Sequence, residues 1–295
     1  MKNFHIKLNK IAFDTDLYLK KFLLNKKKNK SNLITPMKYG FFSGGKRFRS
    51  SILINTGQIF GINRKKLIII GAAIECVHSY SLMHDDLPAM DDDDIRRGKL
   101  SVHKKFNEFT AILSGNALLT LAFEILSNNN LKISSQKKID LIKTLTLCSG
   151  NFGLAEGQFL DLTFEKKKNS KKKIIDMQKK KTGELFGFCC ECAAIIAGKN
   201  KKIRKDLKSI GIDIGLLFQI TDDLIDYRGN STIAGKPTRV DDKKGKATLV
   251  RLLGYKKTIN LANTIKKTLI KRIKKYGSRA NDLLDSVEFI LDRNF

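Results

Sequence analysis

Apolar residues recur at the spacing of an α-helix through most of this 295-residue chain, and this pattern constrains its fold more than any other feature. Side chains at positions i, i+3 and i+4 lie on one face of a helix, and that face has to pack against other helices. Only three prolines interrupt the pattern, and no segment alternates apolar and polar residues as a strand would. The sequence therefore predicts an all-α protein.

The same spacing places the predicted helices along the chain. They cover residues 11–24, 46–60, 67–84, 111–126, 139–158, 174–197 and 203–227, with about three shorter helices from residue 249 onward. The segments between them are polar and lysine-rich, namely residues 26–35, 127–136, 165–173 and 229–246, which is typical of turns rather than interdomain linkers. We therefore expect a single domain over residues 1–295, with its chemistry in the core of a helical bundle.

The chain is strongly basic, with a formal charge of +28 from 57 Lys and Arg against 29 Asp and Glu. Such a charge directly suggests a basic helical protein that binds nucleic acid, and this alternative of a different class stays open. However, Lys, Asn and Ile are all abundant, as in proteins encoded by AT-rich genes, and the lysine runs at 26–28 and 171–173 contain no aromatic residues on which bases would stack. We expect no nucleic-acid partner.

No targeting or membrane segment is evident in the sequence. Residues 1–13 lack the continuous apolar region of a signal peptide. The most apolar stretch, residues 67–74, is far shorter than the roughly 20 residues that a membrane-spanning helix needs. The expectations are a cytoplasmic location and no transmembrane segment.

A first acidic cluster, DDLPAMDDDD, occupies residues 85–94 directly after a long apolar helix. Its six carboxylates repel one another, and a divalent cation such as Mg²⁺ removes that conflict while it bridges substrate phosphates. Asp85 and Asp91 are six residues apart, so an unbroken helix would not place them on one face. We expect Pro88 to distort the chain and re-aim the second group. The alternative is a solvated acidic turn or helix cap.

A second acidic cluster, DDLID, occupies residues 222–226. Asp222 and Asp226 stand at i and i+4 on one face of a predicted helix, with Gln219 beside Asp222. The neighbouring residues are apolar, so these carboxylates are predicted to be metal ligands inside the bundle rather than surface charges. A structural salt bridge is the alternative.

Basic residues stand near both acidic clusters, and their joint occurrence indicates a phosphorylated substrate. Two glycines precede a cationic group at a helix start in GGKRFR, residues 44–49, which favours phosphate capture. Any one lysine in so basic a chain is by default a solvated charge. The candidate basic residues are Lys46, Arg49, Arg96, Arg97, Lys181, Lys236 and Lys246.

Seven segments occur in the order found in the trans-isoprenyl diphosphate synthases. They are GGKRFR, HSYSLMHDDLPAMDDDDIRRGK, GNALLTLAFEIL, GQFLDL, KTGELF, GLLFQITDDLIDYRG and the GK…GKAT loop, and they span residues 40–254. DDLPAMD matches the DDxxxxD first motif of that family, and DDLID matches its DDxxD second motif. The chain resembles this family, and within it the bacterial farnesyl diphosphate synthases, also called geranyltranstransferases.

This resemblance implies a fold and a reaction. The fold would be an all-α, single-domain antiparallel helical bundle around a deep central cavity, usually as a homodimer. The enzyme would be a prenyltransferase that joins dimethylallyl or geranyl diphosphate head to tail with isopentenyl diphosphate, giving farnesyl diphosphate and pyrophosphate. About three Mg²⁺ ions per active site would bind the allylic diphosphate. The allylic carbon–oxygen bond would ionise, and the isopentenyl double bond would attack the carbocation.

The resemblance also implies roles for individual residues. The metal ligands would be Asp85, Asp86, Asp91, Asp222 and Asp226. The catalytic residues, which would stabilise the departing diphosphate or face the carbocation, are Arg96, Lys181, Thr182, Gln219, Lys236 and Lys246, and all of them would also bind substrate. Isopentenyl diphosphate would be held by Lys46, Arg49, His78 and Arg97.

Product length is predicted from the residues that precede the first motif. Tyr80 and Ser81 stand five and four residues before Asp85, and a tyrosine there would block growth beyond fifteen carbons. This favours farnesyl diphosphate, with a geranylgeranyl or mixed-length product as the alternative. A purely structural role of Tyr80 as a core aromatic also stays open.

Overall fold

Helices make up most of the computed structural model, which describes residues 2–25, 31–228 and 245–292. The strands in these ranges are β1 (Ile95–Arg96) and β2 (Lys99–Leu100), which pair antiparallel as a short hairpin. The prediction of an all-α protein is confirmed. The described residues form two compact units, an N-terminal unit of residues 2–54 and 63–142 and a C-terminal unit of residues 55–62 and 143–292.

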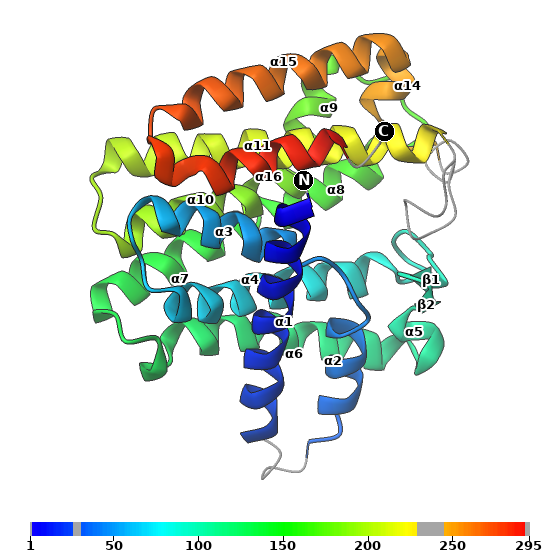
Figure 1. Cartoon of the computed structure of the whole chain (residues 1–295). Coiled ribbons are helices and arrows are strands. Elements are labelled where there is room, and N and C mark those ends of the chain that lie inside the picture. Colours follow the sequence, from blue (N-terminus) through cyan, green and yellow to red (C-terminus); the bar gives the residue numbers. More distant parts are fainter. Residues whose placement is uncertain (1, 26–30, 229–244, 293–295) are drawn as a thin grey trace. The chain divides into compact units, whose positions relative to one another are not determined.

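The N-terminal unit is built around the apolar helix α4 (Arg64–Asp85), which packs extensively on α6 (Glu108–Ser127) and also contacts α1 (Lys2–Asn25) (Figure 1). Every residue from 67 to 77 is buried, so α4 is enclosed on all sides, as a core helix is. Its first turn is capped by Asn63, whose side chain accepts a hydrogen bond from the Lys65 amide at 2.9 Å. The remaining elements of this unit are α2 (Ile34–Phe41), the first part of α3 (Phe48–Ile59), α5 (Val102–Lys105), η2 (Asn129–Leu131) and the first part of α7 (Ser135–Ser149).

In the C-terminal unit the long helix α11 (Lys201–Arg228) lies between α10 (Glu184–Ile196) and α15 (Tyr255–Lys274) (Figure 1). Glycine allows α10 and α11 to approach closely, because a Cβ added at Gly211 would lie 2.3 Å from the Phe186 carbonyl oxygen. The unit also contains α8 (Leu154–Phe164), α9 (Lys171–Gln178), the π-helical turn η3 (Lys179–Gly183), α14 (Leu249–Leu253), η4 (Ser278–Ala280) and α16 (Asn281–Asp292).

Two local predictions were wrong. The helix predicted over residues 139–158 is divided into α7 and α8, because the chain turns at residues 150–153. Gly153 has φ −129° and ψ −121°, and a Cβ there would lie 2.0 Å from the Cys148 carbonyl oxygen. The helix α2 was not predicted, because its eight residues, ITPMKYGF, are too few to show a clear period.

Two helices of the described chain, α4 and α6, are long and apolar enough to cross a membrane by length and composition alone. The apolar window of α4 is 78% buried, and that of α6 is 44% buried. A buried core helix meets the same criterion, which explains α4. The expected absence of a transmembrane segment stays a prediction.

Candidate active site

The first acidic motif lies where α4 ends. The helix stops at Asp85, and the chain then curls back through backbone hydrogen bonds. The Asp91 amide donates to the Asp85 carbonyl oxygen at 2.8 Å, and the Asp93 amide donates to the Asp86 carbonyl oxygen at 3.2 Å. The helix therefore ends shortly before Pro88, in agreement with the predicted distortion. The turn that follows brings Asp91 next to Asp85.

Asp86 differs from its neighbours because it is only 2% exposed and forms an ion pair with Arg96. Arg96 Nε donates to Asp86 Oδ1 at 2.8 Å, and Arg96 Nη2 contacts both Asp86 and Asp93. Burial alone would lower the pKa of Arg96, but the carboxylates of Asp86 and Asp93 outweigh it and raise that pKa above its usual value. Asp86 thus orients Arg96, and its predicted place in a metal shell stays a prediction.

Two glycines of GGKRFR make room for Arg97 in the N-terminal unit. Gly44 and Gly45 have φ of 113° and 112°, and a Cβ at Gly45 would lie 2.6 Å from the Arg97 guanidinium carbon. Arg97 Nη1 donates to the Gly44 carbonyl oxygen. Burial, followed by the charge of Arg47, lowers the pKa of Arg97 to about 10. The loop therefore holds a desolvated arginine, which is suited to binding an anion.

His78 lies among the arginines that were predicted to bind the same diphosphate. Its removal from water lowers its pKa well below the usual value, and the charges of Arg49 and Arg97 add to this shift. This shift favours the neutral imidazole, which can still donate one hydrogen bond to an oxyanion. Lys46, from the same predicted set, is exposed.

Arg47 was assigned no role from the sequence, and the structure gives it a structural one. It is buried, and its Nε donates to Asp16 Oδ1 at 2.8 Å while its Nη2 donates to the Phe41 carbonyl oxygen at 2.7 Å. Its guanidinium carbon also lies 4.3 Å from the centre of the Phe41 ring. This arginine anchors the basic loop to α1 and α2.

The two predicted chain-length residues lie on α4, on the N-terminal side of the first motif. The Tyr80 ring meets the His84 ring edge to face, with centroids 5.1 Å apart. Burial, followed by the nearby charge of Asp85, raises the pKa of Tyr80. Ser81 is buried, and its hydroxyl donates to the His78 carbonyl oxygen at 2.9 Å. Tyr80 thus stands one helical turn from the acidic motif.

The second acidic motif lies inside α11, and its members differ in their surroundings. Asp226 and Asp223 are buried, whereas Asp222 is partly exposed. Asp223 accepts two amide hydrogen bonds, from Gln219 Nε2 at 2.9 Å and from Gln178 Nε2 at 2.7 Å. These two amides fix Asp223, while Asp222 and Asp226 stand one turn apart at the predicted metal-ligand positions.

The π-helical turn η3 carries Lys181 and Thr182. Thr182 Oγ1 donates to Gln219 Oε1 at 2.8 Å, so the structure brings these two predicted site residues together. Gly157 on α8 allows this turn to pack closely, because a Cβ there would lie 2.0 Å from the Lys181 amide nitrogen. Single π turns inside α-helices are frequent at functional sites.

One buried carboxylate joins two predicted phosphate-binding lysines. Asp161 Oδ2 lies 2.6 Å from Lys181 Nζ and 3.0 Å from Lys246 Nζ, and Glu165 lies 2.8 Å from the same atom of Lys246. Burial alone would raise the pKa of Asp161, but the two ammonium groups lower it below its usual value. Asp161 was missed from the sequence, although an aspartate inside the apolar helix segment GQFLDL is the same signal that identified Asp222. Lys236 lies outside the described residues.

The sequence and structure of the chain were compared with those of known proteins. The polyprenyl synthetase family model matches residues 30–287. The farnesyl diphosphate synthase of Escherichia coli (strain K12) is 38% identical over 268 residues, which cover 89% of each chain. An FPP/GFPP synthase from Zymomonas mobilis, solved without ligand, superimposes with a TM-score of 0.86 at 37% identity over 98% of this chain and 100% of its own.

A third relative was solved with ligands. It is the geranyltransferase of Helicobacter pylori complexed with magnesium and isoprenyl diphosphate, which has a TM-score of 0.83 at 29% identity over 98% of this chain and 96% of its own. These matches extend well beyond the segments GGKRFR to GKAT and agree with the resemblance that those segments imply. The chain belongs to the polyprenyl synthetase family.

Proposed function

We propose that this chain is a prenyltransferase that condenses isopentenyl diphosphate with dimethylallyl or geranyl diphosphate to give farnesyl diphosphate and pyrophosphate. The observation that carries the proposal is the pair of complete acidic motifs, each accompanied by basic side chains, in a chain that is 38% identical to a farnesyl diphosphate synthase. We further propose that residues 1–295 form one such domain in the cytoplasm.

The residues present fit Mg²⁺, because the first motif supplies carboxylate oxygens on a tight turn and the second supplies two on one helix face. We assign Asp85, Asp91, Asp222 and Asp226 as direct metal ligands. Asp86 would contact the metal through a bridging water, because its carboxylate forms an ion pair with Arg96. Bound Mg²⁺ would neutralise the charge that develops on the leaving diphosphate. The number of ions, about three, remains part of the proposal.

The protein's own cations assist the same charge development. Lys181 and Lys246 share Asp161, which holds both ammonium groups in place before substrate binds. Such preorganised charges stabilise a developing anion without the cost of reorientation. Arg96 is held in the same way by Asp86, and we propose the same role for it and for Lys236.

Thr182 and Gln219 are proposed to face the carbocation. Thr182 donates to Gln219 Oε1, so the threonine oxygen keeps lone pairs that can stabilise a nearby positive charge. Gln219 in turn is held by Asp223. Isopentenyl diphosphate is proposed to bind Lys46, Arg49, His78 and Arg97, of which the last three lie close together.

The direct test is an assay of the purified chain with Mg²⁺, isopentenyl diphosphate and, separately, dimethylallyl or geranyl diphosphate, with products identified by mass spectrometry. We expect a C15 diphosphate in the presence of Mg²⁺ and no product when EDTA is present from the start. If no condensation occurs and EDTA makes no difference, the prenyltransferase proposal fails. Nucleic-acid binding would then become the leading explanation of the +28 charge.

Tyr80 is proposed to form the floor that limits the product to fifteen carbons. Tyr80→Ala should lengthen the product by one or more C5 units, whereas Tyr80→Phe, which keeps the ring, should not. The alternative of a mixed-length product is supported by the similarity to a synthase named for both FPP and GFPP, and a geranylgeranyl product by the 34% identity to a geranylgeranyl pyrophosphate synthase of Arabidopsis thaliana. A C15 product from Tyr80→Ala would reject the floor, and a C20 product from the unmodified chain would support that alternative.

We also propose that the chain forms a homodimer through α6. Three large apolar side chains on this helix are exposed in the single chain, Phe109 by 65%, Ile112 by 41% and Leu113 by 49%. A contiguous apolar surface of this kind is typical of a protein–protein interface. Sedimentation analysis should give twice the mass of one chain, and Ile112→Asp should shift it toward the monomer. A monomeric unmodified chain would contradict the proposal.

A further inference from the structure

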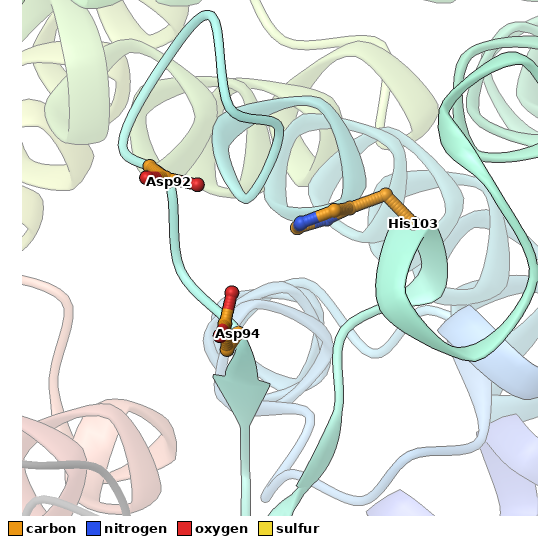
Figure 2. Close-up of side chains that lie close together, drawn as sticks. All are labelled: Asp92, Asp94 and His103. Carbon is orange, nitrogen blue, oxygen red and sulfur yellow. The ribbon is translucent and has the colours of Figure 1, made fainter.

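A histidine and two aspartates converge in the N-terminal unit at residues that the proposed function does not use. The carboxylates of Asp92 and Asp94 and the imidazole of His103 offer ligand atoms that all lie within 4.8 Å of one another. Figure 2 shows the ring of His103 extending from α5 toward both carboxylates, which come from the segment leading into β1. None of the three belongs to the DDxxxxD positions of the first motif.

His103 distinguishes this group from an ordinary acidic cluster. The residue is only 6% exposed, and among the described residues its buried Nε2 has no hydrogen-bond partner. Its other ring nitrogen, Nδ1, lies 3.1 Å from Ser101 Oγ. The tautomer with the proton on Nδ1 donates that proton to Ser101 and leaves a lone pair on Nε2. Metal-binding histidines are oriented in this way, with the second ring nitrogen donating to a neighbour.

The backbone holds the three side chains in place. The β1–β2 hairpin pairs Ile95 with Leu100, and the Ser101 amide extends the ladder by donating to the Asp94 carbonyl oxygen at 2.8 Å. Asp94 and His103 are therefore fixed at the base of one hairpin although they are separated by eight residues. Residue 92 has a left-handed backbone, with φ of 49°.

Electrostatics favour a cation at this place. Two carboxylates and an imidazole lone pair are all acceptors, and they repel one another unless a positive charge lies between them. Lys104 Nζ lies 3.0 Å from Asp94 Oδ1, but this pair is solvent-exposed, with side chains 43% and 62% exposed. An ion pair of this kind is weak and can give way to a metal.

We propose that Asp92, Asp94 and His103 form a second cation site, for a transition-metal ion of the Zn²⁺ type. One imidazole nitrogen and two carboxylate oxygens, with positions left for water, suit such an ion, whereas Mg²⁺ prefers oxygen ligands alone. Ligand atoms of a tetrahedral ion of this type are about 3.4 Å apart at bond lengths of about 2.1 Å. The ligand atoms of the three residues lie within 4.8 Å of one another, and the two aspartate side chains are exposed and can rotate closer to the imidazole.

The proposal is tested on the ¹⁵N-labelled full chain by adding Zn²⁺ in excess Mg²⁺, which occupies sites built from oxygen alone. The chain has four histidines, so their side-chain signals can be assigned by substitution. The Nε2 resonance of His103 should shift on Zn²⁺ binding while Nδ1 stays protonated. In a calorimetric titration, His103→Gln should bind one Zn²⁺ per chain fewer than the unmodified chain. The matched control His5→Gln should bind the same number as the unmodified chain. An unmoved His103 resonance, or equal Zn²⁺ binding by His103→Gln and the unmodified chain, would overturn the proposal.

A second variant decides the matter if His103→Gln fails to fold. Asp92 is exposed, and its backbone lies in the left-handed region, which asparagine also tolerates. The variant Asp92→Asn should therefore fold normally. It should weaken Zn²⁺ binding at least about tenfold. Unchanged Zn²⁺ affinity in this variant would overturn the proposed site. Because the readout is metal binding rather than turnover, its result is independent of the prenyltransferase assay.

Discussion

The first acidic motif begins at the last residue of α4 and continues on a tight turn, whereas the second lies wholly within α11, near its C-terminal end and among buried apolar residues. Each motif contains one buried aspartate whose carboxylate is bound by neighbouring side chains. In the first motif it is Asp86, which is paired with the charge of Arg96, and in the second it is Asp223, which is held by two neutral amides. We propose the remaining acids at the motif positions as the metal ligands. The two motifs thus hold a buried aspartate by different means.

The largest expected effect tests whether both motifs are needed for catalysis. Asp85→Ala and Asp222→Ala should each lower turnover by about a hundredfold or more, because each removes stabilisation of the leaving diphosphate. Steady-state assays with Mg²⁺ would measure the effect, and the exposed Asp285→Ala on α16 serves as a matched control with normal turnover. A large loss in only one of the two motif variants would show that the motifs are not equivalent.

The next effect concerns the two supporting aspartates. Asp86→Asn should lower the free energy of unfolding by about 3 kcal/mol, because Arg96 loses its main counter-charge in a buried pair. Asp223→Asn should cost only about 1.5 kcal/mol, because the amides of Gln178 and Gln219 are neutral donors and one of these hydrogen bonds can be kept. Urea unfolding of both variants measures the difference. Equal losses would remove the distinction between a charged and a neutral support.

The last expected effect is a pH dependence of the stability of the C-terminal unit. The pKa of Asp161 is lowered on folding, so its contribution to stability is present above its unfolded pKa of about 3.9 and is lost as the pH falls through its folded pKa. Asp161→Asn should therefore cost about 2 kcal/mol at neutral pH, and this difference should shrink in acid. Urea unfolding at several pH values measures it. A difference that stays constant below pH ~4 would contradict the assignment.

The helices and both motifs could be predicted from the sequence, because long apolar periods and acids inside them are local signals. The break between α7 and α8 could not, since it depends on a glycine whose missing Cβ avoids the Cys148 carbonyl. Asp161 carried a local signal that was overlooked. The meeting of Asp92 with His103 gave no signal, because it depends on strands of only two residues each, which are too short to show alternation.

The π-helical turn η3 has a consequence for how this chain tolerates change in length. A π turn contains one residue more than an α turn, so it holds an extra residue while the helices on either side keep the same faces toward their neighbours. Deleting one residue from 179–183 would let an ordinary α-helix run on, with α9 and α10 close to their present orientations and with Ile174 and Met177 still buried. The side chains that the turn carries, Lys181 and Thr182, would instead lose their present contacts with Asp161 and Gln219. The loss of one residue from KKKTG should therefore reduce activity far more than stability.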